Sequence, residues 1–192
     1  VPTPMTELFF KTTLEQGQLL DALLTFNTSP QFNYSIAYKG FRSLGKFAFD
    51  QAESGIFRTT FNYSSKNQRY RAKGHYASQD LRGEENGGLL ERVDQFESGN
   101  PDFLDRSRLD LRYRNANSRV LGKRYFLDHS FDLLRTRKDS VQNRTTALSL
   151  GHQFDYESKF YQFTQSAQNE SFGEVFTSPI DDKATLKTMF NQ

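Results

Sequence analysis

Charged side chains recur at every second position in several short stretches of this chain, and this is its clearest chemical signal. In "QRYRAKGHY" (68–76), basic residues alternate with Tyr70, Ala72, Gly74 and Tyr76. The charged positions that follow such an alternation are Arg58, Arg69, Arg71, Lys73, Arg108, Asp110, Arg112, Arg114, Arg124, Asp128 and Asp132. Groups in this pattern either bind a polyanion or line a water-filled pore, where wall charges bias which ions enter.

The alternation itself argues against nucleic acid as the partner. Binders of single strands present cations and stacking aromatic rings on the same surface. Successive side chains of a β-strand point to opposite faces, so in 68–76 the tyrosines and the cations cannot contact one ligand together. The formal net charge of +2 also gives little long-range attraction for a polyanion. We therefore expect no nucleic-acid partner.

The elements that must position these charges are β-strands, because apolar and polar residues alternate with period two along most of the chain. The predicted strands are 6–14, 19–27, 31–40, 55–65, 68–79, 108–114, 120–134, 147–156, 159–165 and 183–191. The stretch "GGLLERVDQFESG" (87–99) is consistent with a short helix inside a loop. The pattern predicts an all-β fold of about ten antiparallel strands in up-and-down order.

The connections between these strands differ in length. Short joins are predicted at "NTSPQ", "SSKNQ", "NANS" and "DYES", and long polar joins at 42–54, 80–105, 135–143 and 166–182. Alternating short turns and long loops are typical of transmembrane β-barrels in outer membranes. A soluble antiparallel sheet alternates in the same way. The many Phe and Tyr residues of the apolar face, which suit aromatic girdles at lipid interfaces, favour the membrane barrel.

Composition and spacing give no sign of catalysis or of a cofactor. The chain has no cysteine, and it has no run of about 18 apolar residues that would form a transmembrane helix. His75, His129 and His152 lie on separate predicted strands without the spacing of metal ligands. No nucleophile motif occurs. We expect neither an enzyme nor a bound metal or cofactor.

Longer strings resemble a known family. These strings are 7–47, "SQDLRGEENGGL" (78–89), "FESGNPDFLDRSRL" (96–109), "GKRYFLDHSF" (122–131) and "HQFDYESKFYQF" (152–163). They resemble the putative porin family of Bacteroidetes-type outer membranes. The resemblance implies an outer-membrane β-barrel whose relatives carry signal peptides and further strands on both sides. Residues 1–192 are accordingly expected to form a single barrel domain or the central fragment of one.

The function expected from these observations is a porin-like channel for passive diffusion of small polar solutes. The alternating charged positions named above are expected to face the lumen. They include more Arg and Lys than Asp and Glu, which predicts a weak preference for anions. In a second interpretation, Arg and Asp of adjacent strands pair with each other along the wall and narrow the lumen. Two further alternatives stay open: a barrel that anchors a surface or secretion complex through loop 80–105, and a soluble β-sheet domain that binds carbohydrate. Outer-membrane lipid is the expected surrounding, and a homo-oligomer or a surface-complex partner is compatible with the sequence.

Overall fold

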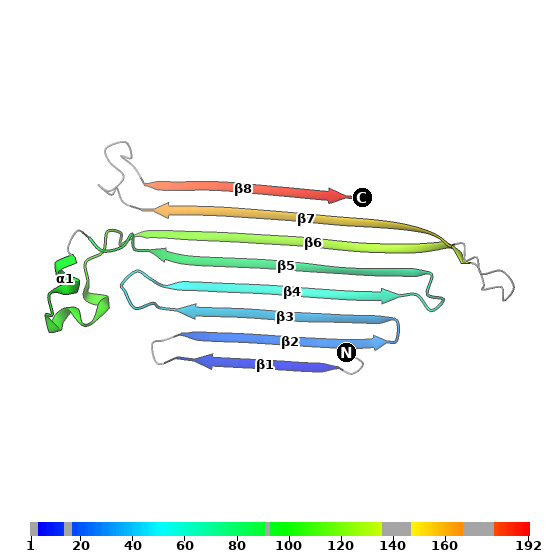
Figure 1. Ribbon diagram of the computed structural model, residues 1–192, viewed down its shortest axis with the longest axis horizontal. Coiled ribbons are helices and arrows are strands. Elements are labelled where there is room, and N and C mark those ends of the chain that lie inside the picture. The colour runs from blue at the N-terminus through cyan, green and yellow to red at the C-terminus, as the bar shows by residue number, and fades with distance from the viewer. Residues whose placement is uncertain (1–3, 14–16, 91–92, 136–146, 167–178) are drawn as a thin grey trace.

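The computed structural model describes residues 4–13, 17–90, 93–135, 147–166 and 179–192. These residues form one antiparallel sheet of eight strands in the order β1 to β8, each strand paired with its neighbours in sequence (Figure 1). The strands are β1 Met5–Thr12, β2 Gln18–Ser29, β3 Phe32–Ser43, β4 Ala52–Ser64, β5 Tyr70–Glu85, β6 Ala116–Arg135, β7 Ala147–Gln165 and β8 Ile180–Asn191. The predicted all-β, up-and-down, antiparallel fold is confirmed.

The two ends of the sheet differ. At one end, here the turn end, β2–β3 and β4–β5 are joined by tight turns. At the other, the loop end, lie the connections 44–51 and 86–115, the second with the helix α1 Val93–Glu97 and two short 3-10 turns (Figure 1). Long loops thus follow β3 and β5 at the loop end, and short turns follow β2 and β4 at the turn end.

Local hydrogen bonds explain why the chain reverses at the β4–β5 turn. The Ser65 side chain accepts from the Tyr70 backbone N–H (2.9 Å), and the Asn67 side chain accepts from the Arg69 backbone N–H (3.1 Å). Gln68 adopts the left-handed region (φ 55°). Ser and Asn favour turns because their side chains satisfy nearby backbone groups in this way. The predicted joins "SSKNQ" and "NTSPQ" are both confirmed.

Three parts of the strand prediction are wrong. The described residues form eight strands, where about ten were expected. Residues 147–156 and 159–165 form one strand, β7, so "DYES" lies inside it, and "NANS" overlaps the start of β6. Residues 108–114 belong to the β5–β6 loop. β6 and β7 have 20 and 19 residues and are longer than ordinary strands. The polar residues inside such long strands therefore resemble turns in the sequence.

Side chains divide between two faces, which the register of the ladder defines because directly paired residues share a face. Face A carries Tyr38, Phe57, Tyr76, Tyr125 and Tyr156. Tyr38 of β3 pairs with Phe57 of β4, and Tyr125 of β6 pairs with Tyr76 of β5 and Tyr156 of β7. Face B carries the residues between them in each strand. The Arg58, Lys73 and Arg124 side chains lie on face B.

The described residues form a single layer with little core of its own. The buried hydrophobic residues are Ala37, Ala72, Leu109, Leu111 and Ala116, whereas large side chains such as Tyr38 and Tyr125 are exposed on face A. A soluble sheet buries its apolar face against a second layer. No such layer occurs among the described residues, so the soluble alternative receives no support from the architecture. None of the described helices is long and apolar enough to cross a membrane.

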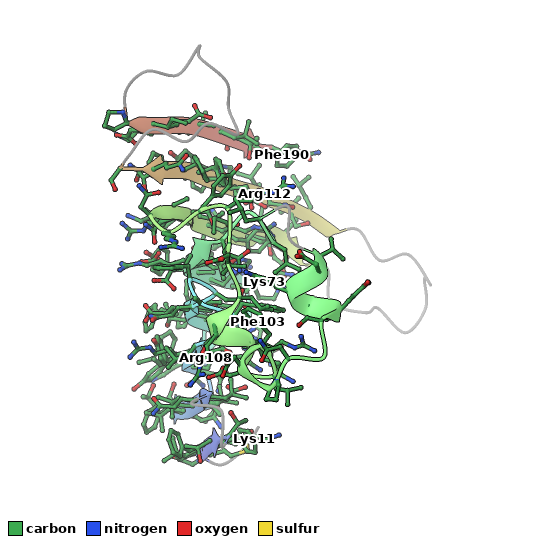
Figure 2. All side chains as sticks on the ribbon, turned by 90° about the vertical axis from the view of Figure 1, so that its left-hand side faces the viewer. Lys11, Lys73, Phe103, Arg108, Arg112 and Phe190 are labelled. Atoms are coloured by element: carbon green, nitrogen blue, oxygen red, sulfur yellow. The ribbon has the colours of Figure 1, made fainter. Side chains whose placement is uncertain are left out.

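The β5–β6 loop is the one large feature outside the layer of strands in the described part of the chain. Figure 2 views the sheet from its loop end and shows α1 on the side of the sheet toward which the labelled Lys11, Lys73 and Phe190 point. These three residues lie on face B. The loop therefore lies beyond the loop end of the sheet, displaced toward the side of face B (Figures 1 and 2).

Candidate functional site

Face B carries a set of ion pairs between neighbouring strands. Their shortest N···O distances are 2.9 Å for Lys39–Asp21, 3.2 Å for Arg71–Asp132, 3.1 Å for Lys73–Asp128 and 2.6 Å for Arg124–Asp155. The first and third pairs join residues directly opposite in the ladder, and the other two are diagonal. Each of these four cations therefore has an anion on a neighbouring strand within reach, and the two charges neutralise each other.

Two of the predicted wall cations, on β4 and just before β5, stay outside these pairs. Arg58 on β4 and Arg69, which directly precedes β5, form no ion pair with any described residue. The imidazole of His75 stacks on the Phe126 ring with centroids 5.1 Å apart. Between β4 and β6, face B is therefore polar but holds more free positive charge than free negative charge.

At the same depth, face A is apolar and is bracketed by large side chains. Each of six successive strands contains a seven-residue segment whose first and last residues are Leu, Phe or Tyr. Most face-A residues between these two ends are small or apolar. These segments are 20–26, 32–38, 57–63, 70–76, 125–131 and 150–156. Both ends are aromatic in 32–38, 57–63, 70–76 and 125–131. Each segment covers about 20 Å along its strand at about 3.3 Å per residue.

The rings at the two ends of these segments form two chains across the sheet. Near the turn end, ring contacts lead from Phe26 to His152, with centroid separations between 5.0 and 6.5 Å, through Tyr34, Phe32, Tyr63, Tyr70 and His129. Nearer the loop end, Phe57, Tyr76, Tyr125 and Tyr156 form the second chain, with separations between 4.8 and 6.3 Å. Two aromatic girdles that flank an apolar band are typical of the lipid-facing side of a membrane barrel.

The girdles are inclined to the hydrogen-bonding direction. Tyr38 pairs with Ala22 and not with Leu20, and Tyr76 pairs with Thr59 and not with Phe57. At each of these two steps, the seven-residue segment of the next strand lies two residues closer to the turn end. The segments of β2 and β7 therefore differ by four residues along the strand direction. With about 3.3 Å per residue and about 4.8 Å between strands, this difference corresponds to strands tilted by about 30° from the girdle normal. Strands of closed barrels tilt by a similar amount.

Gly74 has a physical role inside the apolar band. A Cβ at this position would lie 2.6 Å from the Phe61 ring and 2.8 Å from the Phe126 carbonyl oxygen. The ring of Phe61 therefore lies directly over the backbone of β5, which only glycine permits. In "QRYRAKGHY" the face-A residue Gly74 thus lets a neighbouring ring cover the strand.

The β5–β6 loop has a defined internal structure. The Gln95 amide of α1 donates to the Asp110 carboxylate (3.1 Å) and accepts from the Asp110 backbone N–H (3.3 Å). The Arg106 guanidinium lies 3.9 Å from the centroid of the Phe96 ring, a cation–π contact. The Asp105 carboxylate accepts from the Ser107 hydroxyl and backbone N–H, which holds the pKa of Asp105 below its usual range.

Two leucines hold the loop in place. Leu109 and Leu111 are 4% and 6% exposed, and they line a small hollow of about 180 Å³ together with Ala48 and Phe49 of the β3–β4 loop. Leu111 also forms a β-bridge with Leu89. The alternation in "RLDLRYR" therefore reflects the docking of one loop against another and not a strand.

The structure places the predicted wall residues in two groups, apart from Arg69, which directly precedes β5. Arg58, Arg71, Lys73, Arg124, Asp128 and Asp132 lie on face B as the alternation predicts. Arg108, Asp110, Arg112 and Arg114 lie in the β5–β6 loop, so their assignment to a strand is wrong. There Arg108 pairs with Asp102 and Asp105, and Arg114 pairs with Asp110.

The predicted list omits residues that belong to the same face. Asp21, Lys39 and Asp155 complete ion pairs on face B. The alternation in 31–40 and 147–156 already places Lys39 and Asp155 on the polar face, so the signal was present in the sequence. A single acidic residue in an otherwise uncharged strand does not by itself indicate an ion pair. The register of the ladder is needed to show which cation lies next to it.

Two histidines that are 23 positions apart in sequence meet on face A. His129 and His152 are directly paired in the ladder, with 2.9 Å between His129 Nε2 and His152 Nδ1. The Tyr70 hydroxyl lies 3.4 Å from His129 Nδ1, and Asn191 Oδ1 lies 2.5 Å from His152 Nε2. No cluster of three or more potential metal ligands occurs among the described residues. The pair extends the turn-end girdle as a polar hydrogen-bonded chain.

Comparison with known proteins agrees with this arrangement. The model of the family described as "Putative porin" matches residues 1–192. No curated protein and no solved structure matches the chain. A match over the full length, on a sheet with two opposed faces of this kind, shows that the chain belongs to the Putative porin family.

Proposed function

We propose that this chain forms the wall of a channel through which small polar solutes diffuse passively across the outer membrane. Membership of the family indicates a porin-like role at that membrane in general. One observation carries the finer proposal. At one depth of the sheet, face A is an apolar band between two aromatic girdles, and face B is a row of ion pairs. A wall with this contrast suits lipid on one side and water on the other.

Transport through such a wall needs no bound intermediate. A hydrated lumen admits polar solutes, and the wall charges bias the sign of the ions that enter. The ion pairs on face B cancel most of the charge, whereas Arg58 and Arg69 remain without an ionic partner among the described residues. Between β4 and β6 the remaining positive charge supports a weak preference for anions, and Glu7 on β1 offsets part of it on the same face.

A channel also requires closure of the sheet. Within the described residues, β1 pairs only with β2, and β8 pairs only with β7, so each outer strand has one unpaired edge. Unpaired backbone groups in a bilayer cost on the order of several kcal/mol each, so we propose that further strands pair with both edges. These strands come from a longer chain or from a second copy.

Ion selectivity tests the channel. We expect Arg58→Glu to shift the reversal potential in a salt gradient toward cations, because it replaces the free positive charge on face B. Planar bilayer recordings of the full-length protein measure this shift. Lys66→Glu, in the exposed β4–β5 turn, is the matched control and leaves the potential within a few millivolts. Wild-type protein that inserts into the bilayer without steady channels would contradict the proposal.

A second candidate function rests on the β5–β6 loop. Leu104 and Val93 are 73% and 57% exposed there, although the loop is otherwise well ordered by its own contacts. Exposed apolar side chains on an ordered loop suit a contact with another protein. The barrel would then anchor a surface or secretion complex. The absence of channels, together with loss of a co-purifying partner on Leu104→Asp, would favour this function over diffusion.

A further inference from the structure

A hollow of about 620 Å³ opens on face A, just on the loop side of the aromatic bracket. Its floor is formed by Gly40 and Gly55, which are directly paired and have no side chains to fill the surface. The Tyr38 ring bounds it: a Cβ at Gly40 or Gly55 would lie 2.9 or 3.2 Å from the Tyr38 hydroxyl oxygen. Any larger residue at these two positions would take space from the hollow.

The lining changes character along the strand direction. On the side of the apolar band lie Phe10, Leu20 and Phe57. On the side of the loop end lie Arg42, Glu53 and Arg82. The charged residues are neighbours in the ladder, since Arg42 pairs with Glu53 and Glu53 with Arg82. The hollow is therefore amphipathic, and its polar side coincides with the border of the apolar band.

The charged side continues beyond the hollow, where three arginines lie on face A together with Glu53, Asp80 and Glu84. Arg82 and Arg119 face each other directly in the ladder, which repels unless an anion lies between them. The Asp80 carboxylate accepts from both, at 2.8 Å from each Nη2 atom and at 3.3 and 3.0 Å from the Nε atoms of Arg82 and Arg119. Arg42 pairs with Glu53 at 3.2 Å. Three guanidinium groups thus share two carboxylates.

These arginines retain hydrogen-bond donors. A guanidinium group has five N–H groups in a fixed planar fork, and the contacts to Asp80 use two nitrogen atoms of Arg82 and two of Arg119. The Arg82 and Arg119 side chains are 55% and 39% exposed, so their remaining N–H groups are open to a ligand. Donors of this kind, held in place by a shared carboxylate, suit the oxygens of a phosphate group.

We propose that this hollow binds a phosphate-bearing lipid, with an acyl chain on the Gly40–Gly55 floor and the phosphate at Arg42, Arg82 and Arg119. The inference rests on the proposed function, in which face A meets lipid, and on the usual orientation of outer-membrane barrels, in which the longer loops lie at the outer surface. Charge complementarity and the continuity of the hollow with the apolar band favour a lipid over a free anion. Basic pockets at the membrane border bind anionic headgroups in the same way.

The test compares lipids that differ only in phosphate. The full-length protein in detergent micelles is titrated with a diphosphorylated, acylated glucosamine disaccharide, with its dephosphorylated form, and with inorganic phosphate, while native mass spectrometry counts bound molecules. We expect the diphosphorylated lipid to bind at least about tenfold more tightly than the other two. Arg82→Gln with Arg119→Gln should remove this preference. Arg58→Gln, on face B, is the matched control and should keep it.

A second variant covers the case in which the double substitution fails to fold. Gly55→Leu fills the floor and keeps all three arginines, and it should weaken lipid binding about tenfold. Equal binding of the phosphorylated and dephosphorylated lipids would overturn the proposal, as would inorganic phosphate that competes fully, because the site would then recognise the ion alone. Conductance of the same samples separates the two proposals: steady channels without a lipid preference contradict only the lipid site.

Discussion

The turn half and the loop half of the same strands have opposite chemistry. The register row through Gly55, Asp80 and Leu121 divides them. In the turn half of β5, Tyr70 and Tyr76 lie on face A, and Arg71 and Lys73 lie on face B. In the loop half the pattern reverses, with charged residues on face A and apolar ones on face B. The loop-half residues that show the reversal are Asp80, Arg82 and Arg119 on face A, and Leu81, Val120 and Phe163 on face B.

This reversal indicates two surroundings for one sheet. In the turn half, lipid on face A and water on face B explain the aromatic band and the ion pairs. In the loop half, the same proposed placement puts water beside the arginines of face A, and the β5–β6 loop lies beyond the ends of these strands on the side of face B (Figure 2). The alternation of side-chain direction is the same along the whole strand, and on the proposed placement the border between lipid and water beside face A falls between Tyr76 and Asp80 on β5.

The largest expected effect comes from placing a charge on face A of the turn half. Leu23 and Leu24 are neighbours inside segment 20–26 at the same depth, but Leu24 lies on face A and Leu23 on face B. We expect Leu24→Arg to destabilise the inserted protein by about 2–4 kcal/mol, because the guanidinium group would face lipid. Leu23→Arg should cost far less, since it faces water and lies opposite Glu7. Urea titration of the protein folded into lipid vesicles measures both.

Equal losses from the two arginines would contradict the assignment of the faces. A larger loss from Leu23→Arg would mean that the faces are inverted. The pair is a strict comparison because residue type, strand and depth are the same and only the face differs.

Alternation in the sequence was sufficient to predict the sheet and the faces of its central strands. In 68–76, both the tyrosines and the cations lie where the pattern placed them. The prediction was wrong where the solvent changes along a strand. Residues 80–85 read as loop because charged residues at face-A positions do not fit a lipid-facing pattern, yet β5 continues to Glu85.

The opposite error occurred at 108–114. Leu109 and Leu111 alternate with charged residues as a strand would, but they are buried by contact between loops. Period two cannot distinguish a strand from a short extended loop segment that docks through every second residue. The row Arg42, Glu53, Arg82 and Arg119 was also missed, because its members are far apart in sequence and only the register brings them together.

A moderate effect is expected at the loop end, where the β5–β6 loop docks against the β3–β4 loop. Leu109→Ala should destabilise the docked loop by about 2 kcal/mol, because it removes a buried side chain from the contact with the β3–β4 loop. A loop that is released from this contact should be cleaved faster by protease and, if it borders the channel mouth, should change single-channel conductance. Leu104→Ala, at a position that is 73% exposed, is the matched control and should change neither quantity. Unchanged cleavage of Leu109→Ala would mean that other contacts hold the loop.

The smallest expected effect concerns two ion pairs on face B that differ in exposure. The Asp132 side chain is 12% exposed and Arg71 is 59% exposed, whereas Asp21 and Lys39 are 42% and 55% exposed. Asp132→Asn should lower the free energy of unfolding by about 1 kcal/mol, because a shielded carboxylate interacts more strongly with its cation. Asp21→Asn should cost less than about 0.5 kcal/mol, as is usual for exposed pairs.

Salt separates the two pairs further. About 1 M salt should abolish the effect of Asp21→Asn, because ions reach exposed charges, and should leave most of the effect of Asp132→Asn. Urea unfolding in vesicles at low and high salt measures both differences. If both variants respond equally to salt, then water and ions reach Asp132 as freely as Asp21, and the turn end of face B borders an open aqueous space. If neither responds, face B is closed off along its whole length, which would favour a plugged barrel over a channel.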